Sequence, residues 1–369
     1  MSTMTLDGLK AHYAGRRVFV TGSTGFKGSW LCRMLVRLGA DVTGYSLVPP
    51  TYPSLFEIAA ISGDINQVIG DVRDIDKLRA AFDLAEPQTV LHLAAQPLVL
   101  DGYAEPRYTY EVNVMGTVNV LECARECESV TSLLNVTTDK VYENREIPGY
   151  GYREDDKLDG FDPYSNSKSC SELATHSYAQ SFFAEGAKGS AAGRCAISTA
   201  RAGNVIGGGD FSANRIVPDS VRAALSGERL VLRNPNSIRP YQHVLEPLTA
   251  YLMIAAAQDD DHSKAGWYNV GPDPVDCKTT GEMADMFAAA WGEGFSWHAE
   301  RTDGPHEAGL LMLANDKIKR ELGWRPAWVA EEAVKRTAEW TRAWQDGQAT
   351  QCMDDQIDEY YDALFRRSE

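Results

Sequence analysis

Length, composition and charge restrict the classes of protein to which this chain can belong. It has 369 residues, of which 44% are apolar and 24% charged, so a globular protein with a sizeable core is expected. The formal net charge of −16 makes nucleic acid an unfavourable partner, because an acidic chain repels phosphate backbones. A small diphosphate remains possible, since clustered arginines and backbone N–H groups can bind one locally.

Cysteine spacing and the lack of long apolar runs bear on metal content and location. The seven cysteines are irregularly spaced and form no CxxC pair, which predicts neither a metal site nor a disulfide framework. No run of about eighteen apolar residues occurs, and residues 1–14 lack the apolar core of a signal peptide. We therefore expect a cytoplasmic protein with reduced thiols and no membrane contact.

Short apolar strands alternate with helical periodicity in the first half of the chain. We predict strands at 17–22, 41–45, 67–69, 90–93, 133–136 and 196–199, and helices at 25–38, 75–84, 113–127 and 164–183. Such alternation is typical of a parallel sheet with helices on both faces. Because the crossovers are right-handed, the sheet should be doubly wound, which gives an α/β Rossmann domain over residues 15–200.

The pattern changes after Arg201, where glycine, proline and arginine become frequent and the elements shorter and more mixed. We expect a smaller mixed lobe, built from 201–240 and 271–345, that closes over the carboxyl edge of the sheet. Residues 241–270 are expected to return to the Rossmann domain. The charged, helical pattern of 346–369 predicts a C-terminal helical tail at the surface.

Three glycines, Gly22, Gly25 and Gly28, lie between the first predicted strand and the first predicted helix. They permit a tight turn and close approach of the backbone to a pyrophosphate at the helix N-terminus. The GxxGxxG spacing is weak evidence alone, but in this context it predicts dinucleotide binding. Phe26 and Lys27 complete the turn, and Lys27 can reach a ribose hydroxyl or a 2′-phosphate.

The end of the second strand, residues 44–48, lacks the carboxylate that usually holds an adenosine ribose. The choice between NAD and NADP therefore stays open. Asp71, followed by Val72, ends the third strand and can accept a hydrogen bond from the adenine amine. Alternatively Asp71 caps the helix at 75–84, a role for which Asp74 competes.

Two polar groups have the spacing of a proton-transfer site. Tyr164 and Lys168 are four residues apart, which places both on one face of a helix. An ammonium beside a phenol lowers the phenol pKa, so the tyrosine can take a proton from a hydroxyl while hydride leaves the same carbon. Thr138, Asp139 and Lys140 follow the fifth strand, at the edge where a doubly wound sheet presents residues to its ligand.

Together these segments resemble the extended short-chain dehydrogenase/reductases and, within them, the CDP-glucose 4,6-dehydratases. The resemblance spans about residue 17 to about residue 345. It is carried by the residues described above and by the stretches 25–31, 53–57, 94–99, 113–117, 162–165, 201–210, 243–248 and 291–294. Ser23 and Leu100 depart from the pattern, where a histidine and an arginine are expected, and leave the substrate and cofactor preference open.

The resemblance implies a sugar-nucleotide 4,6-dehydratase that converts CDP-glucose to a 4-keto-6-deoxy sugar. It implies that Tyr164 takes the 4-hydroxyl proton, that Lys168 holds the cofactor ribose, and that Thr138 orients the reacting oxygen. Asp139 is implied to be the neutral acid that protonates the leaving 6-oxygen. Relatives carry glutamate as the C5 base at the position of Lys140, so this lysine, or a water that it holds, is expected to take that role.

The resemblance also implies binding residues and partners. NAD is the expected cofactor, with NADP not excluded, and the loop after the fourth strand is expected to contact it through Leu93, Ala94 and Ala95. The nucleotide sugar is expected to be bound by Gln96, Asn204, Arg215, Arg233 and Arg239. Relatives commonly pair through the helices at 113–127 and 164–183, which implies a homodimer or higher homo-oligomer.

Two other functions share part of this pattern. An epimerase or decarboxylase of the same class needs the glycine turn, Tyr164 and Lys168 but no acid–base pair after Thr138, so Asp139 and Lys140 favour dehydration. A protein that only binds dinucleotide has no need for the tyrosine and lysine that this chain retains.

Overall fold

The computed structural model describes residues 4–187, 189, 191–300 and 309–366. Its centre is a seven-stranded parallel sheet in the order β11-β6-β5-β4-β1-β2-β3. The strands are β1 (Arg17–Thr21), β2 (Asp41–Ser46), β3 (Asn66–Ile69), β4 (Thr89–His92), β5 (Ser132–Thr138), β6 (Ala196–Ala202) and β11 (Trp267–Val270). This order reverses direction beside β1, so the predicted doubly wound α/β fold is confirmed.

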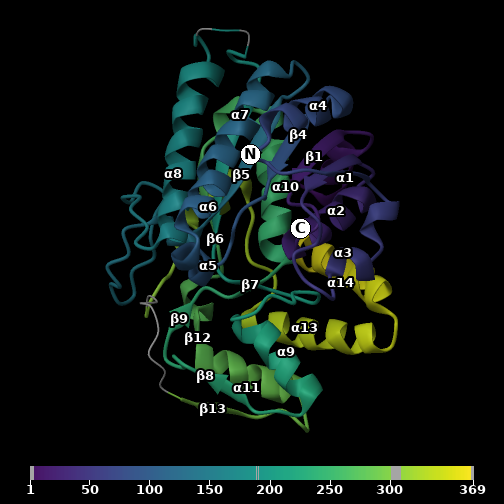
Figure 1. Cartoon of the computed structure of the whole chain (residues 1–369), viewed down its shortest axis with the longest axis vertical. Helices are drawn as coiled ribbons and strands as arrows, with labels where there is room; N and C mark the ends of the chain where they lie inside the picture. The colour runs from purple at the N-terminus through teal and green to yellow at the C-terminus, as the bar shows by residue number, and fades with distance from the viewer. Residues whose placement is uncertain (1–3, 188, 190, 301–308, 367–369) are drawn as a thin grey trace.

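Side chains alternate between the two faces of the sheet and form two separate cores. Val18 and Val20 of β1 pack on one face and Phe19 packs on the other. The first face is covered by α1 (Leu6–Tyr13), α2 (Phe26–Arg37), α10 (Leu245–Asp260) and α12 (Asp316–Leu322). The second face is covered by α4 (Ile75–Ala85), α7 (Gly116–Glu126) and α8 (Pro163–Tyr178). Figure 1 shows α7 and α8 side by side along the upper body.

Short elements connect the strands near the carboxyl edge of the sheet. They are α3 (Leu55–Ile58), α5 (Val99–Ala104) and α6 (Pro106–Tyr110). α10 is apolar over most of its surface and is almost wholly buried between the sheet and its neighbours, which explains its composition. No helix of the described segments is long and apolar enough to span a membrane.

A second lobe lies beyond the carboxyl ends of the strands, at the lower end of Figure 1. Its helices are α9 (Ile216–Ser226), α11 (Thr280–Trp291) and α13 (Ala330–Gln345), and it has its own apolar core around Met283, Phe287 and Val334. Three short strand pairs complete it: β7 (Val205–Ile206) with β10 (Gln242–His243), β8 (Leu230–Leu232) with β13 (Trp297–Ala299), and β9 (Ile238–Arg239) with β12 (Lys278–Thr279).

The C-terminal helix α14 (Ala349–Phe365) differs from the expected surface tail. One of its faces is buried in the main core through Met353, Ile357 and Tyr360. Its other contacts include a bidentate ion pair between Arg33 and Asp354, with N···O distances of 2.7 and 2.6 Å. The expectation was wrong because apolar residues spaced three and four apart within 353–364 form a buried stripe despite the charges between them.

Candidate active site

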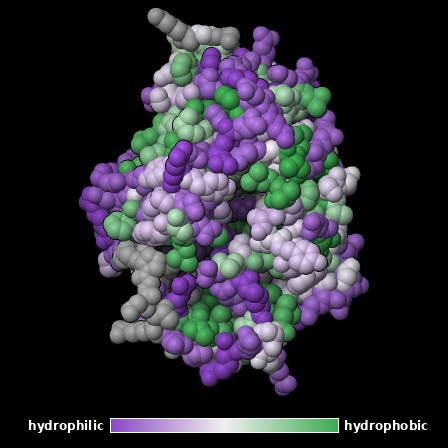
Figure 2. Space-filling view, viewed as in Figure 1, coloured by the Kyte–Doolittle hydropathy of each residue, from purple (hydrophilic) through white to green (hydrophobic). Residues whose placement is uncertain are grey.

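A large cavity of about 710 Å³ lies between the sheet and the second lobe. Its lining comes from the loops that follow β1 to β6 and from the second lobe, and the space-filling view shows a recess in this region near the middle of the face (Figure 2). Most residues predicted to bind or react line it: Gly22, Gly25, Phe26, Lys27, Gly28, Asp71, Val72, Leu93, Ala94, Ala95, Thr138, Asp139, Lys140, Tyr164, Lys168, Asn204, Arg215, Arg233 and Arg239.

The glycine turn has the shape that a dinucleotide diphosphate requires. Gly22 has φ of +76°, and a Cβ on Gly28 would lie 2.0 Å from the Gly22 carbonyl oxygen, so neither position accepts a side chain. α2 starts after Gly25 without a side-chain cap, which leaves its first N–H groups free of a side-chain partner beside the cavity. These features fit a dinucleotide cofactor.

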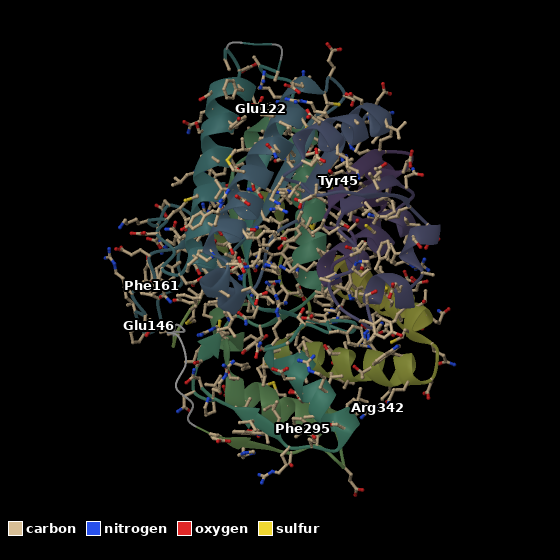
Figure 3. The ribbon with its side chains drawn as sticks, in the orientation of Figure 1. Tyr45, Glu122, Glu146, Phe161, Phe295 and Arg342 are labelled. Atoms are coloured by element: carbon tan, nitrogen blue, oxygen red, sulfur yellow. The ribbon has the colours of Figure 1, made fainter. Side chains whose placement is uncertain are left out.

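The end of the cavity next to the glycine turn is polar, but no carboxylate stands at the carboxyl end of β2. Ser46 stands where an acidic residue is usual, and its hydroxyl donates to Thr24 Oγ1 at 2.9 Å. The Tyr45 hydroxyl, labelled in Figure 3, donates to the Asp71 backbone oxygen at 3.0 Å and fixes the end of β3. Asp74 caps α4, whereas Arg73 binds the Asp71 carboxylate and lowers its pKa. Asp71 is therefore not the helix cap.

Lys27 extends from the glycine turn toward the catalytic residues. Burial lowers its pKa to about 8, and the charges that act on it are those of Arg215, Asp139 and Asp210. It also lowers the pKa of Lys168, so the two ammonium groups are neighbours. Asp139 and Asp210, which act on Lys27, lie at the end of the cavity that holds the catalytic residues. The position of the Lys27 ammonium therefore does not favour the expected contact with an adenosine ribose or 2′-phosphate.

Thr138 ends β5, and Asp139 and Lys140 form a short turn of 3₁₀ helix directly after it. The Thr138 hydroxyl donates to Asp139 Oδ1 at 2.9 Å, while Asp139 Oδ2 is buried and has no hydrogen-bond partner among the described residues. Burial raises the pKa of Asp139, which favours its neutral form. The carboxyl group is therefore suited to donate a proton into the cavity.

Tyr164 and Lys168 lie on the first turns of α8, which begins after the Asp162 cap. The Lys168 ammonium donates to the Val136 backbone oxygen at 3.2 Å, and burial lowers its pKa to about 8. Burial also raises the pKa of Tyr164 to about 12, with a smaller opposite effect from the Thr138 hydroxyl. The expectation of a lowered tyrosine pKa was wrong for the chain alone, because desolvation of the phenol outweighs the nearby donor.

The second lobe contributes cationic and amide groups to the far wall. Asn204 and Arg233 line the cavity, and the buried Arg239 guanidinium donates to the Ile238 backbone oxygen at 2.9 Å. Arg215 pairs at 3.3 Å with Asp210, a buried carboxylate that is not among the site residues predicted from the sequence. A glycine run, 207–209, immediately precedes Asp210 and was the available signal for a residue held in a tight loop.

Gln96 was predicted to bind substrate, but it does not line the cavity. Its side chain is buried and used internally: Nε2 donates to Thr109 Oγ1 at 2.9 Å, and Oε1 accepts from the Leu98 N–H at 2.5 Å. The Asn113 side chain accepts a hydrogen bond from the Gln96 N–H and donates one to the Gln96 backbone oxygen. The amide of Gln96 therefore shapes the turn after β4 and has no free group for a ligand.

Comparison with known proteins agrees with this geometry. The family model described as GDP-mannose 4,6 dehydratase matches residues 19–337. The CDP-glucose 4,6-dehydratase of Salmonella typhimurium is 45% identical over 321 residues, which cover 86% of this chain and 88% of the relative.

Solved structures share the fold. The dTDP-glucose 4,6-dehydratase of Bacillus anthracis in complex with NAD has a TM-score of 0.73 at 20% identity, covering 90% of this chain and 98% of that one. The UDP-glucose-4-epimerase of Stenotrophomonas maltophila with bound NAD and formylated UDP-arabinopyranose has a TM-score of 0.76 at 21% identity, covering 90% and 99%. The predicted resemblance is confirmed, and the chain belongs to the GDP-mannose 4,6 dehydratase family.

Proposed function

We propose that this protein is a nicotinamide-dependent 4,6-dehydratase of a nucleotide-activated hexose, and that its substrate is CDP-glucose. The observation that carries the dehydratase proposal is the buried Asp139 carboxyl, with one unpartnered oxygen, on the same cavity wall as Thr138 and Tyr164. The choice of CDP-glucose is supported by the 45% identity to the Salmonella enzyme of that activity.

The first step oxidises C4 of the hexose. Tyr164 accepts the proton of the 4-hydroxyl while the C4 hydrogen leaves as hydride, and Thr138 hydrogen-bonds the same oxygen. Tyr164 must be a phenolate for this step, and the positive charge of Lys168, one helical turn away on α8, favours that form. A nicotinamide cofactor held beside Lys168 would supply the reversible hydride acceptance that this oxidation and the later reduction at C6 require.

The second step removes water across C5 and C6. The 4-ketone acidifies the C5 hydrogen, and Lys140, or a water that it holds, takes this proton. Asp139 gives its proton to the 6-oxygen, so that the C6–O bond breaks and water leaves. Return of a proton to C5 from the same base, with hydride delivered to C6, completes the 4-keto-6-deoxy product. Tyr164 then holds the proton taken from the 4-hydroxyl and Asp139 lacks the proton that left with water, so transfer of one proton from Tyr164 to Asp139, directly or through solvent, restores the starting protonation states.

We propose NAD as the cofactor. The dehydratase from Bacillus anthracis and the UDP-glucose 4-epimerase from Thermus thermophilus were both solved with NAD. In this chain the glycine turn and the N-terminus of α2 would hold the diphosphate, and Lys168 would hold the nicotinamide ribose. Within the described residues, the end of β2 offers hydroxyls and no arginine or lysine for a 2′-phosphate.

We also propose a cytoplasmic homodimer. Met115 and Leu173, at the start of α7 and on α8, are both about half exposed, which leaves apolar surface on the helices through which relatives are expected to pair. All seven cysteines are unpaired, which suits a reducing compartment.

The test is incubation of the purified protein with NAD or NADP and, separately, CDP-, dTDP-, UDP- and GDP-hexoses. Loss of one water by mass spectrometry, with the alkaline absorbance of a 4-keto-6-deoxy sugar, is expected for CDP-glucose. Turnover of another nucleotide only would retain the mechanism and change the substrate. Interconversion of hexose epimers without loss of water would favour an epimerase.

A further inference from the structure

A buried ion pair between Glu172 and Arg201 lies directly behind the catalytic residues. The two side chains are fully buried, and Arg201 Nη2 lies 2.9 Å from Glu172 Oε2. Glu172 is one helical turn beyond Lys168 on α8, whereas Arg201 lies on β6, so the pair links a helix to the sheet. Neither residue lines the cavity, and the reaction proposed above uses neither of them.

Glu172 also binds the strand that carries the catalytic turn. Its carboxylate accepts hydrogen bonds from the hydroxyls of Thr137, which immediately precedes Thr138, and Thr199, the latter at 2.6 Å. His176, one turn further along α8, lies 3.1 Å from the same carboxylate. One carboxylate therefore joins α8, β5 and β6 beside the catalytic groups.

Arg201 holds the other end of the catalytic turn. Its Nη1 donates to the Tyr142 hydroxyl at 2.8 Å, and its guanidinium carbon lies 5.1 Å above the Tyr142 ring. Tyr142 directly follows the turn of residues 139–141, and its hydroxyl donates to Asn269 on β11 at 2.6 Å. The turn with Asp139 and Lys140 is thus bounded by Thr137 on one side and Tyr142 on the other, and both contact the pair.

A buried ion pair is a costly way to fill a protein interior, because apolar residues of similar size are often as stabilising. Its advantage is geometric, since charged hydrogen bonds in fixed directions specify where their partners lie. On the basis of the dehydratase function proposed above, we infer that Glu172 and Arg201 are positioning residues that keep the Thr138–Lys140 turn and Lys168 in their catalytic arrangement.

The pair also affects the charge of Lys168. Glu172 raises the Lys168 pKa, against burial and Lys27, which lower it. The groups that face Lys168 are Lys27 from the start of α2, His92 from β4, which burial keeps neutral, and Glu172 with Tyr164 from α8 itself. Loss of the Glu172 charge would leave the ammonium less stable, so it would lose its proton at lower pH.

The test uses three variants: Glu172→Gln, Arg201→Met and the double variant that carries both changes. Glu246→Gln serves as the control. Glu246 is a matched control, because it is also a fully buried glutamate and binds the Ala327 and Trp328 N–H groups away from the cavity. Each variant is measured for thermal midpoint, for kcat and KM with CDP-glucose across pH, and for NAD affinity by calorimetry across the same pH range.

We expect both single variants to lose stability and up to about 100-fold in kcat, with KM changed by less than about twofold. In the double variant the midpoint should recover, since no unpaired charge remains, while kcat stays low. Glu172→Gln should move the alkaline loss of activity and of NAD affinity to lower pH. Glu246→Gln should lose stability and keep its kcat and pH profile.

Recovery of kcat together with stability in the double variant, or an unchanged pH profile in Glu172→Gln, would overturn the inference. If the double variant does not fold, Tyr142→Phe decides: it removes only the hydroxyl that Arg201 contacts, and an unchanged kcat contradicts the positioning role. If the unaltered protein dehydrates no nucleotide hexose, the proposed function fails, whereas the pH dependence of NAD binding in Glu172→Gln still tests the pair.

Discussion

At the scale of single residues, the site combines groups whose burial is unfavourable for folding and useful for chemistry. Asp139 is 1% exposed and has an unpartnered oxygen, and Lys27 and Lys168 are both ammonium groups whose pKa is lowered to about 8. Buried charges with incomplete pairing destabilise a fold. Their presence on one cavity wall is therefore best explained by catalysis.

Asp139→Asn should separate the two effects. We expect kcat to fall by a factor of about 10² to 10⁴, because the amide cannot protonate the leaving oxygen. The pKa of Asp139 is raised in the folded protein, so the stability it contributes is present at low pH and is lost as pH rises through the folded-state pKa. The thermal midpoint of the variant, measured relative to that of the parent, should therefore increase as pH rises. A difference between the two midpoints that does not change with pH would contradict this.

Lys27→Met should change the pKa of Lys168. Removing one positive charge raises the pKa of Lys168, which Lys27 now lowers. We expect the alkaline loss of kcat to move to higher pH, opposite to the direction expected for Glu172→Gln. The pH profile of Lys27→Arg serves as the control, since it keeps the charge, and a shift in that variant equal to the shift in Lys27→Met would argue against a charge effect.

At the scale of elements, tight packing holds the loop that carries Asp210. The Trp30 indole donates to the Gly208 backbone oxygen at 3.0 Å, and a Cβ on Gly208 would lie 2.1 Å from Cγ of Trp340 on α13. α2, the loop and α13 are thereby fixed together, and Asp210 and its partner Arg215 are placed at the cavity.

Gly208→Ala should disturb this contact. Because the tryptophan cannot move without repacking the core, we expect a loss of about 1–3 kcal/mol in the free energy of unfolding, with weaker CDP-glucose binding. Urea unfolding measures the first and calorimetry the second. Gly63→Ala is the matched control, since its Cβ would meet no atom within 4 Å, and an equal loss there would exclude the steric explanation.

Elements with mainly apolar runs could be predicted from the sequence, and those that depend on distant partners could not. Val18–Val20 and Leu133–Val136 predicted buried parallel strands correctly. β11 was missed because it lies in the mixed region that follows Arg201, and because its Asn269 is buried only through Tyr142 and backbone oxygens far along the chain. The exposure of α14 was misjudged because its charges hid its apolar stripe.

The same limit applies to the site. The glycine turn, the Thr138–Lys140 turn and the Tyr164–Lys168 pair each lie within a few residues of chain, so local spacing was sufficient to predict them. The Glu172–Arg201 pair joins residues 29 positions apart, and only the fold brings them together. Gln96 was assigned to the ligand because its internal partner Thr109 could not be foreseen.

At the scale of the whole molecule, the C-terminal helix completes the main core. Ile357 of α14 is fully buried in the cluster that also contains α2 and α10. Ile357→Ala should therefore cost about 2–5 kcal/mol in the free energy of unfolding, by urea denaturation. Leu84→Ala on α4, at 84% exposure, should change it by less than about 0.5 kcal/mol. A similar small effect at Ile357 would show that the helix is dispensable for stability.

Dehydration of CDP-glucose by the whole chain is measured most directly by incubation with CDP-glucose and NAD in deuterium oxide. We expect a 4-keto-6-deoxy product that has lost one water and carries deuterium at C5, because the C5 proton is removed and replaced from solvent. We also expect Asp139→Asn to form much less of this product. Recovery of unchanged or epimerised sugar, with NAD bound to the protein, would contradict dehydration.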